Sequence, residues 1–415
     1  MRTEPPADLD PLAGRRILVA TSGSIAAVKL PLVVSALAKR GADVRCVLSP
    51  SAAQLVSPVA LASLSRERCY LDADQWSHHA ARPLHVELAE WAELVLLAPL
   101  SATTLARWVH GLGDTLLASI LLATEAPVLA AAAMNTAMWG APAVRANWAE
   151  LQRFERVLPL GPAEGLLACD RLGAGRMAEP ELLLLALESL ATWGWRRDWQ
   201  GRRLLVSAGP TREWFDPARC ITNPSSGRMG VALAQAARLR GARVELVHGP
   251  LQVEQAWLEG LHAHPIETGA ELGAVLRRLQ PQVDAIAMAA AVADHRPAVA
   301  LRQKPDKAAL AEAMAAGFEL VPDLLVDLVR QRQPGQRILG FAAHSGDVLP
   351  QAQAKFARKG CDLLFANPID LPGVGFGSTT NEGWLLGPGE AVEPLARMSK
   401  LQLAHRLLSA LGGQG

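Results

Sequence analysis

One cysteine of this chain stands in a segment that suits chemistry better than packing. Cys169 lies in "LGPAEGLLACDRLGAGRMAEP", residues 160–180, where repeated glycines disfavour a steady helix or strand and predict a loop with unusual backbone angles. A structural cysteine normally lies among aliphatic residues, so Cys169 is a candidate for a chemical role. The alternative is an irregular loop that carries a chance thiol.

Four other side chains could act on a substrate. His85 carries the side chain whose free pKa lies nearest neutrality, although a surface histidine at the start of a helix or strand is the alternative. Asn135 follows the apolar run "VLAAAAM" as a lone amide with no apolar role. Lys355 and Lys359 are spaced i, i+4 on a predicted helix and can face one anion, but such a pair more often forms a solvated face.

Two similar chain openings would position these residues. "RRILVATSGSIAA" begins at Arg15 and "RRLLVSAGP" at Arg202, and each leads from an apolar strand through a small-residue loop and a helix to "RGA" and a second strand. This order predicts a βαβ unit whose loop amides and helix N-terminus can hold phosphate. Neither opening contains G-x-G-x-x-G, so the usual dinucleotide fingerprint is absent.

Further apolar runs alternate with helical segments in both halves. "AELVLLAP", "APVLAAAAM", "AIAMAAAVAD", "RILGFAA" and "CDLLFANP" predict strands, while "SATTLARWVHGLGDTLLASILLA" and "LPQAQAKFARKG" predict helical segments. We therefore expect an α/β protein with two Rossmann-like, doubly wound and mostly parallel sheets. Ligand sites of such sheets lie at the carboxyl ends of the strands, where most of the candidate residues fall. The expected parts are a loose N-terminal tail (1–14) and two domains, 15–194 and 195–415.

Composition narrows the class of protein. The 415 residues are 50% hydrophobic and 20% charged, with a net charge of +1, which indicates a globular protein and disfavours nucleic acid as a main partner. The five cysteines are scattered and form no C-x-x-C pair, so we expect a reducing cytoplasm rather than disulfides or zinc. Neither a signal peptide nor a membrane span is predicted.

Ordered motifs give the chain a family resemblance. The first half resembles the flavin-dependent cysteine decarboxylases in "TSGSIAA", "LHVEL", "APLSATT", "AMN" and "LACDRLGAGRM". The second half resembles phosphopantothenate–cysteine ligase in "SAGPTREWFDPARCITNPSSGRMG", "AAVADHRP", "KPDK" and "GFAA". In this order they resemble the bifunctional family of coenzyme A biosynthesis, in which phosphopantothenoylcysteine decarboxylase is fused to the ligase.

For the first half the resemblance implies FMN-dependent decarboxylation of phosphopantothenoylcysteine to 4′-phosphopantetheine. Loss of CO₂ needs an electron sink, which the family obtains when FMN oxidises the substrate thiol to a thioaldehyde. His85 would be the base, Asn135 would bind the substrate carboxylate, and Cys169 would protonate the ene-thiol as its loop closes. FMN would be held by Gly23, Ser24, Ile25, Ser49, Ser101 and Thr104. The alternative for each serine or threonine is helix capping.

For the second half the resemblance implies CTP-dependent ligation of cysteine to 4′-phosphopantothenate through an acyl-cytidylate, with Mg²⁺ on the triphosphate. Asn223 would bind the acyl-cytidylate, Lys304 would be the catalytic lysine, and Ser225 to Gly227 would form a phosphate cradle. The sequence does not assign the metal ligands. The nucleotide contacts implied are Met288, Ala289, Ala290, Asp294, Lys304, Pro322, Asp323, Leu324, Leu325, Phe341, Lys355 and Lys359.

The chain departs from the family pattern at a few positions: Thr103, Asp170 with Arg171, His295, Asp306 and His344. The resemblance further implies a homo-oligomer, up to a dodecamer built from decarboxylase trimers and ligase dimers, with small-molecule substrates only. A flavin-binding regulatory subunit without activity is the rival in a different class. A nicotinamide dehydrogenase is a third option, which the missing glycine fingerprint disfavours.

Overall fold

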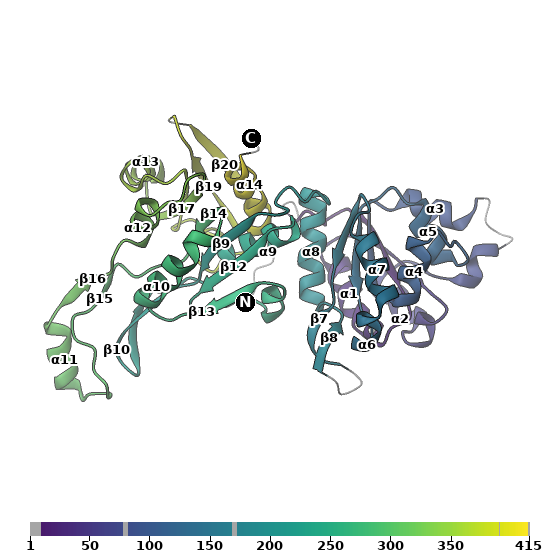
Figure 1. Cartoon of the computed structure of the whole chain (residues 1–415), viewed down its shortest axis with the longest axis horizontal. Helices are drawn as coiled ribbons and strands as arrows, with labels where there is room; N and C mark the ends of the chain where they lie inside the picture. Colours follow the sequence, from purple (N-terminus) through teal and green to yellow (C-terminus); the bar gives the residue numbers. More distant parts are fainter. Residues whose placement is uncertain (1–9, 78–81, 168–171, 390, 414–415) are drawn as a thin grey trace. The chain divides into compact units, whose positions relative to one another are not determined.

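The computed structural model describes residues 10–77, 82–167, 172–389 and 391–413. The chain divides between Arg196 and Arg197 into two compact units, each with its own sheet and helices (Figure 1). Both units are α/β, and this confirms the predicted class with open, mostly parallel sheets.

The first unit is built on a six-stranded parallel sheet of order β3-β2-β1-β4-β5-β6. In this doubly wound order the chain changes direction between β1 and β4, and a crevice opens there at the carboxyl ends of the strands. The central strand β4 is buried along its whole length, which is why its sequence is a continuous apolar run. The strands are β1 (Arg16–Thr21), β2 (Asp43–Leu48), β3 (Cys69–Leu71), β4 (Leu94–Leu100), β5 (Val128–Ala132) and β6 (Val157–Leu160).

Helices cover both faces of this sheet (Figure 1). A core of buried side chains joins β1, β4 and β5 to α3 (Leu84–Trp91), α4 (Ala102–Val109), α5 (Leu116–Ala123) and α7 (Pro142–Leu151). On the other face α1 (Leu30–Lys39) contacts α2 (Pro58–Ser65) and α8 (Pro180–Trp193). The predicted helical segment 101–123 is divided into α4 and α5, because Gly111 takes a positive φ of 70° and Thr115 starts α5 as its N-cap.

The segment around the candidate cysteine is not the irregular loop that its glycines predicted. β7 (Ala163–Leu166) and β8 (Leu172–Arg176) pair as an antiparallel hairpin in which Gly165 lies opposite Gly173. Both glycines take positive φ, 143° and 154°, which explains how a glycine-rich sequence fits strands that ordinary side chains could not follow. Cys169, Asp170 and Arg171 lie outside the described residues.

The second unit repeats the doubly wound order and then extends it. Its sheet has the order β13-β12-β9-β14-β17-β18-β19-β20, parallel through β18 and antiparallel at the last two strands, which the sequence had not predicted. The strands are β9 (Arg203–Ala208), β12 (Arg243–His248), β13 (His262–Pro265), β14 (Ala285–Met288), β17 (Arg337–His344), β18 (Leu363–Pro368), β19 (Thr380–Leu386) and β20 (Val392–Ser399).

Helices again lie on both faces. α10 (Gly269–Leu279), α12 (Leu324–Arg330) and α13 (Val348–Lys359) share one apolar core with β9, β14 and β17, while α9 (Arg228–Leu239) and α14 (Lys400–Gly412) contact each other and the remaining face. Two ribbons leave the sheet, β10 (Arg212–Asp216) with β11 (Arg219–Thr222) and β15 (His295–Pro297) with β16 (Phe318–Leu320). Together with α11 (Lys307–Ala315), β15 and β16 form an arm that projects from this sheet (Figure 1).

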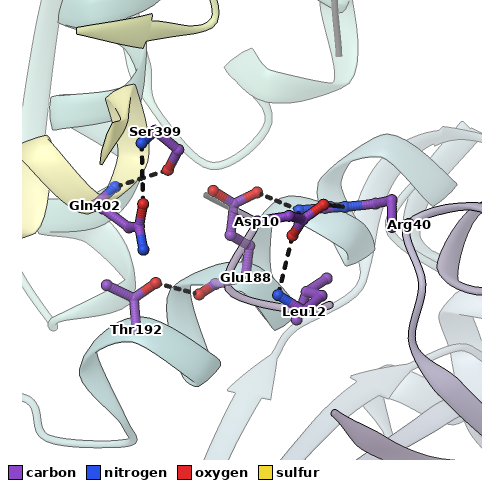
Figure 2. A network of polar contacts seen from close by, with 7 residues as sticks. All are labelled: Asp10, Leu12, Arg40, Glu188, Thr192, Ser399 and Gln402. Carbon is purple, nitrogen blue, oxygen red and sulfur yellow. Dashed lines mark hydrogen bonds and ion pairs between the residues drawn. The ribbon is translucent and has the colours of Figure 1, made fainter. Parts of the chain in front are cut away.

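The described end of the predicted loose tail is packed. Asp10 accepts hydrogen bonds from Arg40 Nε (2.6 Å) and Nη2 (2.7 Å), and Arg40 Nη2 also bonds Glu188 Oε2 at 2.9 Å (Figure 2). Leu12 is fully buried. Residues 10–14 therefore belong to the first unit, because one ionic cluster and one apolar anchor tie them to α1 and α8.

Candidate active sites

A cleft of about 950 Å³ opens at the carboxyl ends of β14 and β17 in the second unit. Its lining also includes residues between β9 and α9, so the cleft extends to the place between β9 and β14 where the strand order changes direction, as expected for a ligand site of a doubly wound sheet. Of the residues that the resemblance implied for the second half, the cleft brings together Asn223, Met288, Ala289, Ala290, Asp294, Pro322, Asp323, Leu324, Leu325, Phe341, Lys355 and Lys359. Their roles stay predictions.

Positive side chains outnumber negative ones along this cleft. Five cationic residues line it, against the two carboxylates Asp294 and Asp323; the cationic residues are Arg228, Lys355, Arg358, Lys359 and Lys400. Such an excess favours anionic ligands and raises their local concentration.

The amide of Asn223 ties the strand-end loop in place. Its Nδ2 donates to the carbonyl oxygens of Ala291 and Val292, each at 3.2 Å. Since both carbonyls belong to the loop between β14 and Asp294, Asn223 holds the main chain that forms one wall of the cleft. Its donors thus serve the protein itself.

The segment Met288–Ala290 is fixed from the neighbouring strand. The Ser207 hydroxyl on β9 bonds Met288 Sδ at 3.0 Å and accepts from the amide of Ala290 at 3.1 Å. Phe341 on β17 packs edge-on against Phe365 with ring centroids 5.9 Å apart. These contacts present an apolar wall on which a flat ring can lie.

The helix α13 carries a group of cations that faces Asp323. Lys359 forms an ion pair with Asp323, whose Oδ1 also accepts from Val326 N at 3.3 Å as the N-cap of α12. Burial alone would raise the pKa of Asp323, but these two contacts hold it below its usual value. Burial and the nearby charge of Lys359 lower the pKa of Lys355. The i, i+4 pair therefore lines the cleft rather than a purely solvated face.

The arm does not bring Lys304 to this cleft. Lys304 is exposed on the stretch between β15 and α11, whereas Asp306, which stands where the family has a lysine, caps α11 by accepting from Ala309 N at 2.9 Å. His295 is exposed on β15. His344 ends β17 with Nε2 buried and unpartnered among the described residues, and burial followed by the charge of Lys355 lowers its pKa.

Sequence reasoning missed five polar residues of the cleft: Arg228, Arg358, Asn367, Asn381 and Lys400. Arg228 follows the predicted phosphate cradle directly, and Arg358 stands beside Lys359, so the quoted motifs already contained both. Asn381 and Lys400 come from β19 and α14, long after those motifs, and only the fold brings them to the cleft. The sequence signal that could have identified Lys400 is a lysine at the start of an otherwise mostly apolar helix.

In the first unit, the predicted flavin-binding loop follows β1 at the point where the strand order changes direction. Ser22 Oγ donates to Pro99 O at 2.7 Å and accepts from Ser101 N at 2.8 Å, which joins the loops after β1 and β4. An added Cβ at Gly23 would come within 2.4 Å of Ser51 Cβ, so Gly23 must be glycine where the loop after β1 approaches the loop after β2.

Some of the serine hydroxyls predicted to bind FMN act as caps of helices, which was the alternative interpretation. Ser101 caps α4 by accepting from Thr104 N at 3.3 Å, and Ser49 accepts from Ala52 N at 3.3 Å. Ser24 starts a short 3-10 helix, Ile25–Lys29, without a side-chain cap. Ile25 itself is exposed, with 56% of its surface accessible. The capping bonds use both oxygens as acceptors, and the Ser101 hydroxyl also donates to Thr104 Oγ1 at 3.3 Å.

The predicted acid–base residues lie at the same edge of the sheet but are not joined by a described contact. His85 is the second residue of α3, which leads into β4, so the start of this helix lies toward the carboxyl ends of the strands. Asn135 follows β5 and caps α6 (Thr136–Gly140), accepting from Ala137 N at 2.8 Å. Two buried polar atoms here have no partner among the described residues, His85 Nδ1 and Thr136 Oγ1. Such atoms fit a site completed by a ligand.

A cluster at Glu179 connects this edge to the base of the hairpin. Lys29 Nζ, next to the predicted flavin loop, bonds Glu179 Oε1 (2.7 Å) and Oε2 (2.6 Å), and Arg176 at the end of β8 also pairs with Glu179. Burial alone would raise the pKa of Glu179, but its two cationic partners lower it. Sequence reasoning missed this cluster.

Within the described ranges, no group of three or more histidine, cysteine, aspartate or glutamate side chains is arranged to hold a metal ion. The same ranges contain no helix both long and apolar enough to cross a lipid bilayer.

Comparison with protein families agrees with the division into two units. Residues 7–191 match the family described as flavoprotein, and residues 199–413 match the DNA/pantothenate metabolism flavoprotein C-terminal domain. The fold and the two matches together define a two-part flavoprotein.

Curated relatives span almost the whole chain. The Coenzyme A biosynthesis bifunctional protein CoaBC of Bacillus subtilis (strain 168) is 34% identical and covers 96% of this chain and 97% of its own length. The protein of that name from Escherichia coli (strain K12) is 36% identical over 94% of this chain and 95% of its own, and the one from Mycobacterium bovis (strain ATCC BAA-935 / AF2122/97) is 39% identical over 96% of each. The chain belongs to this family of coenzyme A biosynthesis bifunctional proteins.

Two solved structures are similar to separate parts of the chain. The C-terminal domain of a Coenzyme A biosynthesis bifunctional protein CoaBC is 29% identical, with a TM-score of 0.43, over 52% of this chain and 97% of that chain. The FMN-dependent cysteine decarboxylase SpaF is 29% identical, with a TM-score of 0.38, over 43% of this chain and 98% of that chain.

Proposed function

We propose that the chain catalyses two consecutive steps of coenzyme A biosynthesis. The second unit joins cysteine to 4′-phosphopantothenate at the expense of CTP, and the first unit decarboxylates the phosphopantothenoylcysteine formed to 4′-phosphopantetheine. The observation that carries this proposal is the cationic cleft at the strand-order change of the second unit, in a chain that matches bifunctional relatives along almost its whole length.

The cleft suits the activation of a carboxylate. The substrate carboxylate attacks the α-phosphorus of CTP, pyrophosphate leaves, and the amine of cysteine then attacks the acyl carbon and displaces CMP. Lys355 and Lys359 offer positive charge to the phosphates, and Phe341 with Met288 offers an apolar surface to the base. Asn223 fixes the loop that carries Asp294.

A magnesium ion fits this cleft through its substrate rather than through a protein cage. Mg²⁺ in nucleotide sites is held by phosphate oxygens and one or two carboxylates and keeps several waters. Asp294, exposed to the cleft beside the Asn223-held loop, is the carboxylate that would contact the ion, since Asp323 is paired with Lys359. The small number of carboxylates along the cleft is therefore consistent with an Mg²⁺ ion that is held mainly by the phosphate oxygens of the nucleotide.

FMN fits the first unit at the crevice between β1 and β4. Gly23, Ser24 and Ile25 begin a helical turn whose amides can hold a phosphate, with Ser49, Ser101 and Thr104 nearby as hydroxyl donors. When bound, the flavin supplies the electron sink for loss of CO₂. His85 would act as the base at the reacting centre, Asn135 would bind the substrate carboxylate, and Cys169 would protonate the ene-thiol.

The proposal includes self-association in the cytoplasm. Large apolar side chains are exposed around the flavin-binding loop, including Ile25 (56%), Val28 (53%), Leu32 (65%) and Val59 (75%). Surfaces of this kind usually mark interfaces, and copies of this chain are the expected occupants, in assemblies up to a dodecamer. Light scattering of the purified chain would report a mass several times that of the monomer.

A mass-spectrometric product assay tests the function. Purified protein receives 4′-phosphopantothenate, cysteine, Mg²⁺ and either CTP or ATP, and phosphopantetheine is expected with CTP. The Cys169→Ser variant should stall before that product. Phosphopantothenoylcysteine alone would mean that the ligase works and that the decarboxylase is disabled, with Thr103 and Asp170-Arg171 as the first positions to revert.

No product with either nucleotide would contradict the enzymatic proposal and favour the flavin-binding regulatory subunit. The absorbance spectrum separates this rival from a nicotinamide enzyme, because a bound flavin gives a yellow protein. No observation on the described residues favours either rival.

A further inference from the structure

Lys400 is a buried lysine held at a fixed place in the cleft. It is the first residue of α14 and follows Ser399, whose hydroxyl accepts from Gln402 N (3.1 Å) while Gln402 Oε1 accepts from Ser399 N (2.9 Å) (Figure 2). This reciprocal cap fixes the main chain at Lys400. Lys400 is only 5% exposed, yet it lines the cleft.

The ammonium group of Lys400 has little to neutralise it. Its Nζ donates to Gly375 O at 2.9 Å, which uses one of its three hydrogens, and no described carboxylate lies within ion-pair distance. Burial, followed by the charge of Arg228, lowers the pKa of Lys400 to about 8. A buried cation without an anion is costly, so the protein retains it against a free-energy penalty.

The surroundings of Lys400 are suited to an oxyanion. Arg228 begins α9 and lines the same cleft, as do Ser225, Ser226 and Gly227 directly before it. The cations of α13 form a separate group, in which Asp323 already pairs with Lys359. The group at Lys400 and Arg228 is thus a second concentration of positive charge, on different elements of the fold.

We propose that Lys400, together with Arg228, binds a phosphate group of a substrate in this cleft, with Gly375 O positioning the ammonium. The inference rests on the proposed function and names a binding group for it. Two parts of the substrates offer this chemistry: the pyrophosphate end of the nucleotide and the phosphomonoester of 4′-phosphopantothenate.

Calorimetric titration of the full chain distinguishes the two sources. Inorganic pyrophosphate, 4′-phosphopantothenate and pantothenate are titrated into the wild type and Lys400→Met. Loss of a charged hydrogen-bond partner should weaken one phosphate probe by about 10- to 100-fold. Pantothenate, which has no phosphate, should bind both proteins equally. Lys39→Met, an exposed lysine of α1, is the control that removes one charge outside the cleft.

The pH dependence supplies a readout that a structural role would not move. Phosphate binding by the wild type should weaken as pH rises through about 8, because Lys400 loses its proton there. Lys400→Arg stays charged and should keep its affinity to higher pH. Arg228 on α9 is the charged neighbour that acts on Lys400; Asp294, Asp323, Lys355, Arg358 and Lys359 also line the cleft. Because the pKa of Lys355 is also lowered, Lys355→Arg is measured in parallel.

Three outcomes would overturn the inference: unchanged phosphate affinity in Lys400→Met, equal weakening of pantothenate, or a pH dependence that only Lys355→Arg removes. Misfolding of the second unit is separated by the calorimetric unfolding transition of that unit, which Lys400→Met should retain. The proposed function fails separately: wild-type protein that forms no ligation product but binds phosphate through Lys400 would contradict the function alone.

Discussion

At the scale of single residues, a polar side chain of the candidate site in the second unit hydrogen-bonds the main chain of the protein and thereby fixes the shape of the cleft. Asn223 was predicted to bind the acyl-cytidylate, but its amide donors are directed to the carbonyls of Ala291 and Val292. The residue therefore acts first on the loop that carries Asp294. This arrangement explains why an amide, with two donors at one nitrogen, is needed there.

Replacing Asn223 by aspartate should disable ligation. The carboxylate has no hydrogen to donate and would repel both carbonyls, at a cost of about 1–3 kcal/mol for each buried acceptor left unsatisfied. We expect ligation to fall by a factor of about 100 or more in a CTP-dependent product assay. Asn147→Asp, on α7 of the first unit, should leave ligation at the wild-type rate. Equal losses in both variants would contradict the assignment.

Glu179 gives a residue-scale prediction for stability in the first unit. Its pKa is lowered in the folded state by Lys29 and Arg176, so its contribution is present above the unfolded pKa near 4.5 and is lost as pH falls through the folded value. Glu179→Gln should therefore lower the melting temperature at pH 7, corresponding to about 1–2 kcal/mol, and this difference should shrink as pH falls below the unfolded pKa. Thermal unfolding over a series of pH values checks this, and a difference that stays constant as pH falls would exclude the ionic explanation.

At the scale of elements, the glycine-rich segment forms the hairpin β7–β8 although its composition predicted a loop, because its glycines allow close packing against neighbouring main chain. An added Cβ at Gly175 on β8 would lie 2.4 Å from Met134 O and 2.7 Å from Leu167, whereas Gly140 on α6 has nothing within 4 Å. The hairpin thus lies directly against the strand end that carries Asn135. Met134 N donates to Gly175 O at 3.0 Å, which fixes this approach.

A matched pair of glycine substitutions tests the role of this contact. Gly175→Ala should push the hairpin away from Asn135 and reduce decarboxylation of supplied phosphopantothenoylcysteine by about tenfold or more, since a misplacement near 1 Å can cost 100-fold. Gly140→Ala should have no such effect. Ligation by the second unit serves as the internal control for both proteins, and equal decarboxylation rates in the two variants would refute the positioning role.

The elements that the sequence predicted are those with a strong local pattern. The strands around Leu97, Ala287 and Leu339 are continuous apolar runs, and α13 has a clear amphipathic spacing, so both kinds were found. The hairpin β7–β8 was missed because its strands alternate glycine with other residues and owe their form to contacts with Met134 and Thr136. The arm formed by β15, α11 and β16 was not predicted, and neither was the exposed position of Lys304. The local sequence does not show in which direction a ribbon projects from the sheet.

The candidate site was predicted to a similar degree and for the same reason. Motif residues such as Met288 and Phe341 lie on neighbouring strands of the sheet, β14 and β17, so the sheet order brings them together. Lys400 reaches the cleft only through α14 packing on α9, a contact between segments that are far apart in the sequence. Sequence spacing cannot show such a contact.

At the scale of the whole molecule, the two units have separate sheets and separate apolar cores. Each carries its own candidate site at its own change of strand order. A ligand of one site should therefore stabilise one core and leave the other unchanged, since binding stabilises only the unit that it contacts. Unfolding of the full chain can therefore test whether the two units are independent in stability and in ligand binding.

Calorimetric unfolding of the full chain should show two transitions, and CTP with Mg²⁺ should shift only one. At a nucleotide concentration of about 100 times Kd the linked stabilisation is about 2.7 kcal/mol, which is enough to move the peak of the second unit to a clearly higher temperature. Lys355→Met should reduce the shift, whereas Gly175→Ala should leave it unchanged and lower the other transition instead. A single transition that CTP moves as a whole would mean that the units unfold together, and a shift that Lys355→Met leaves intact would place the nucleotide outside this cleft.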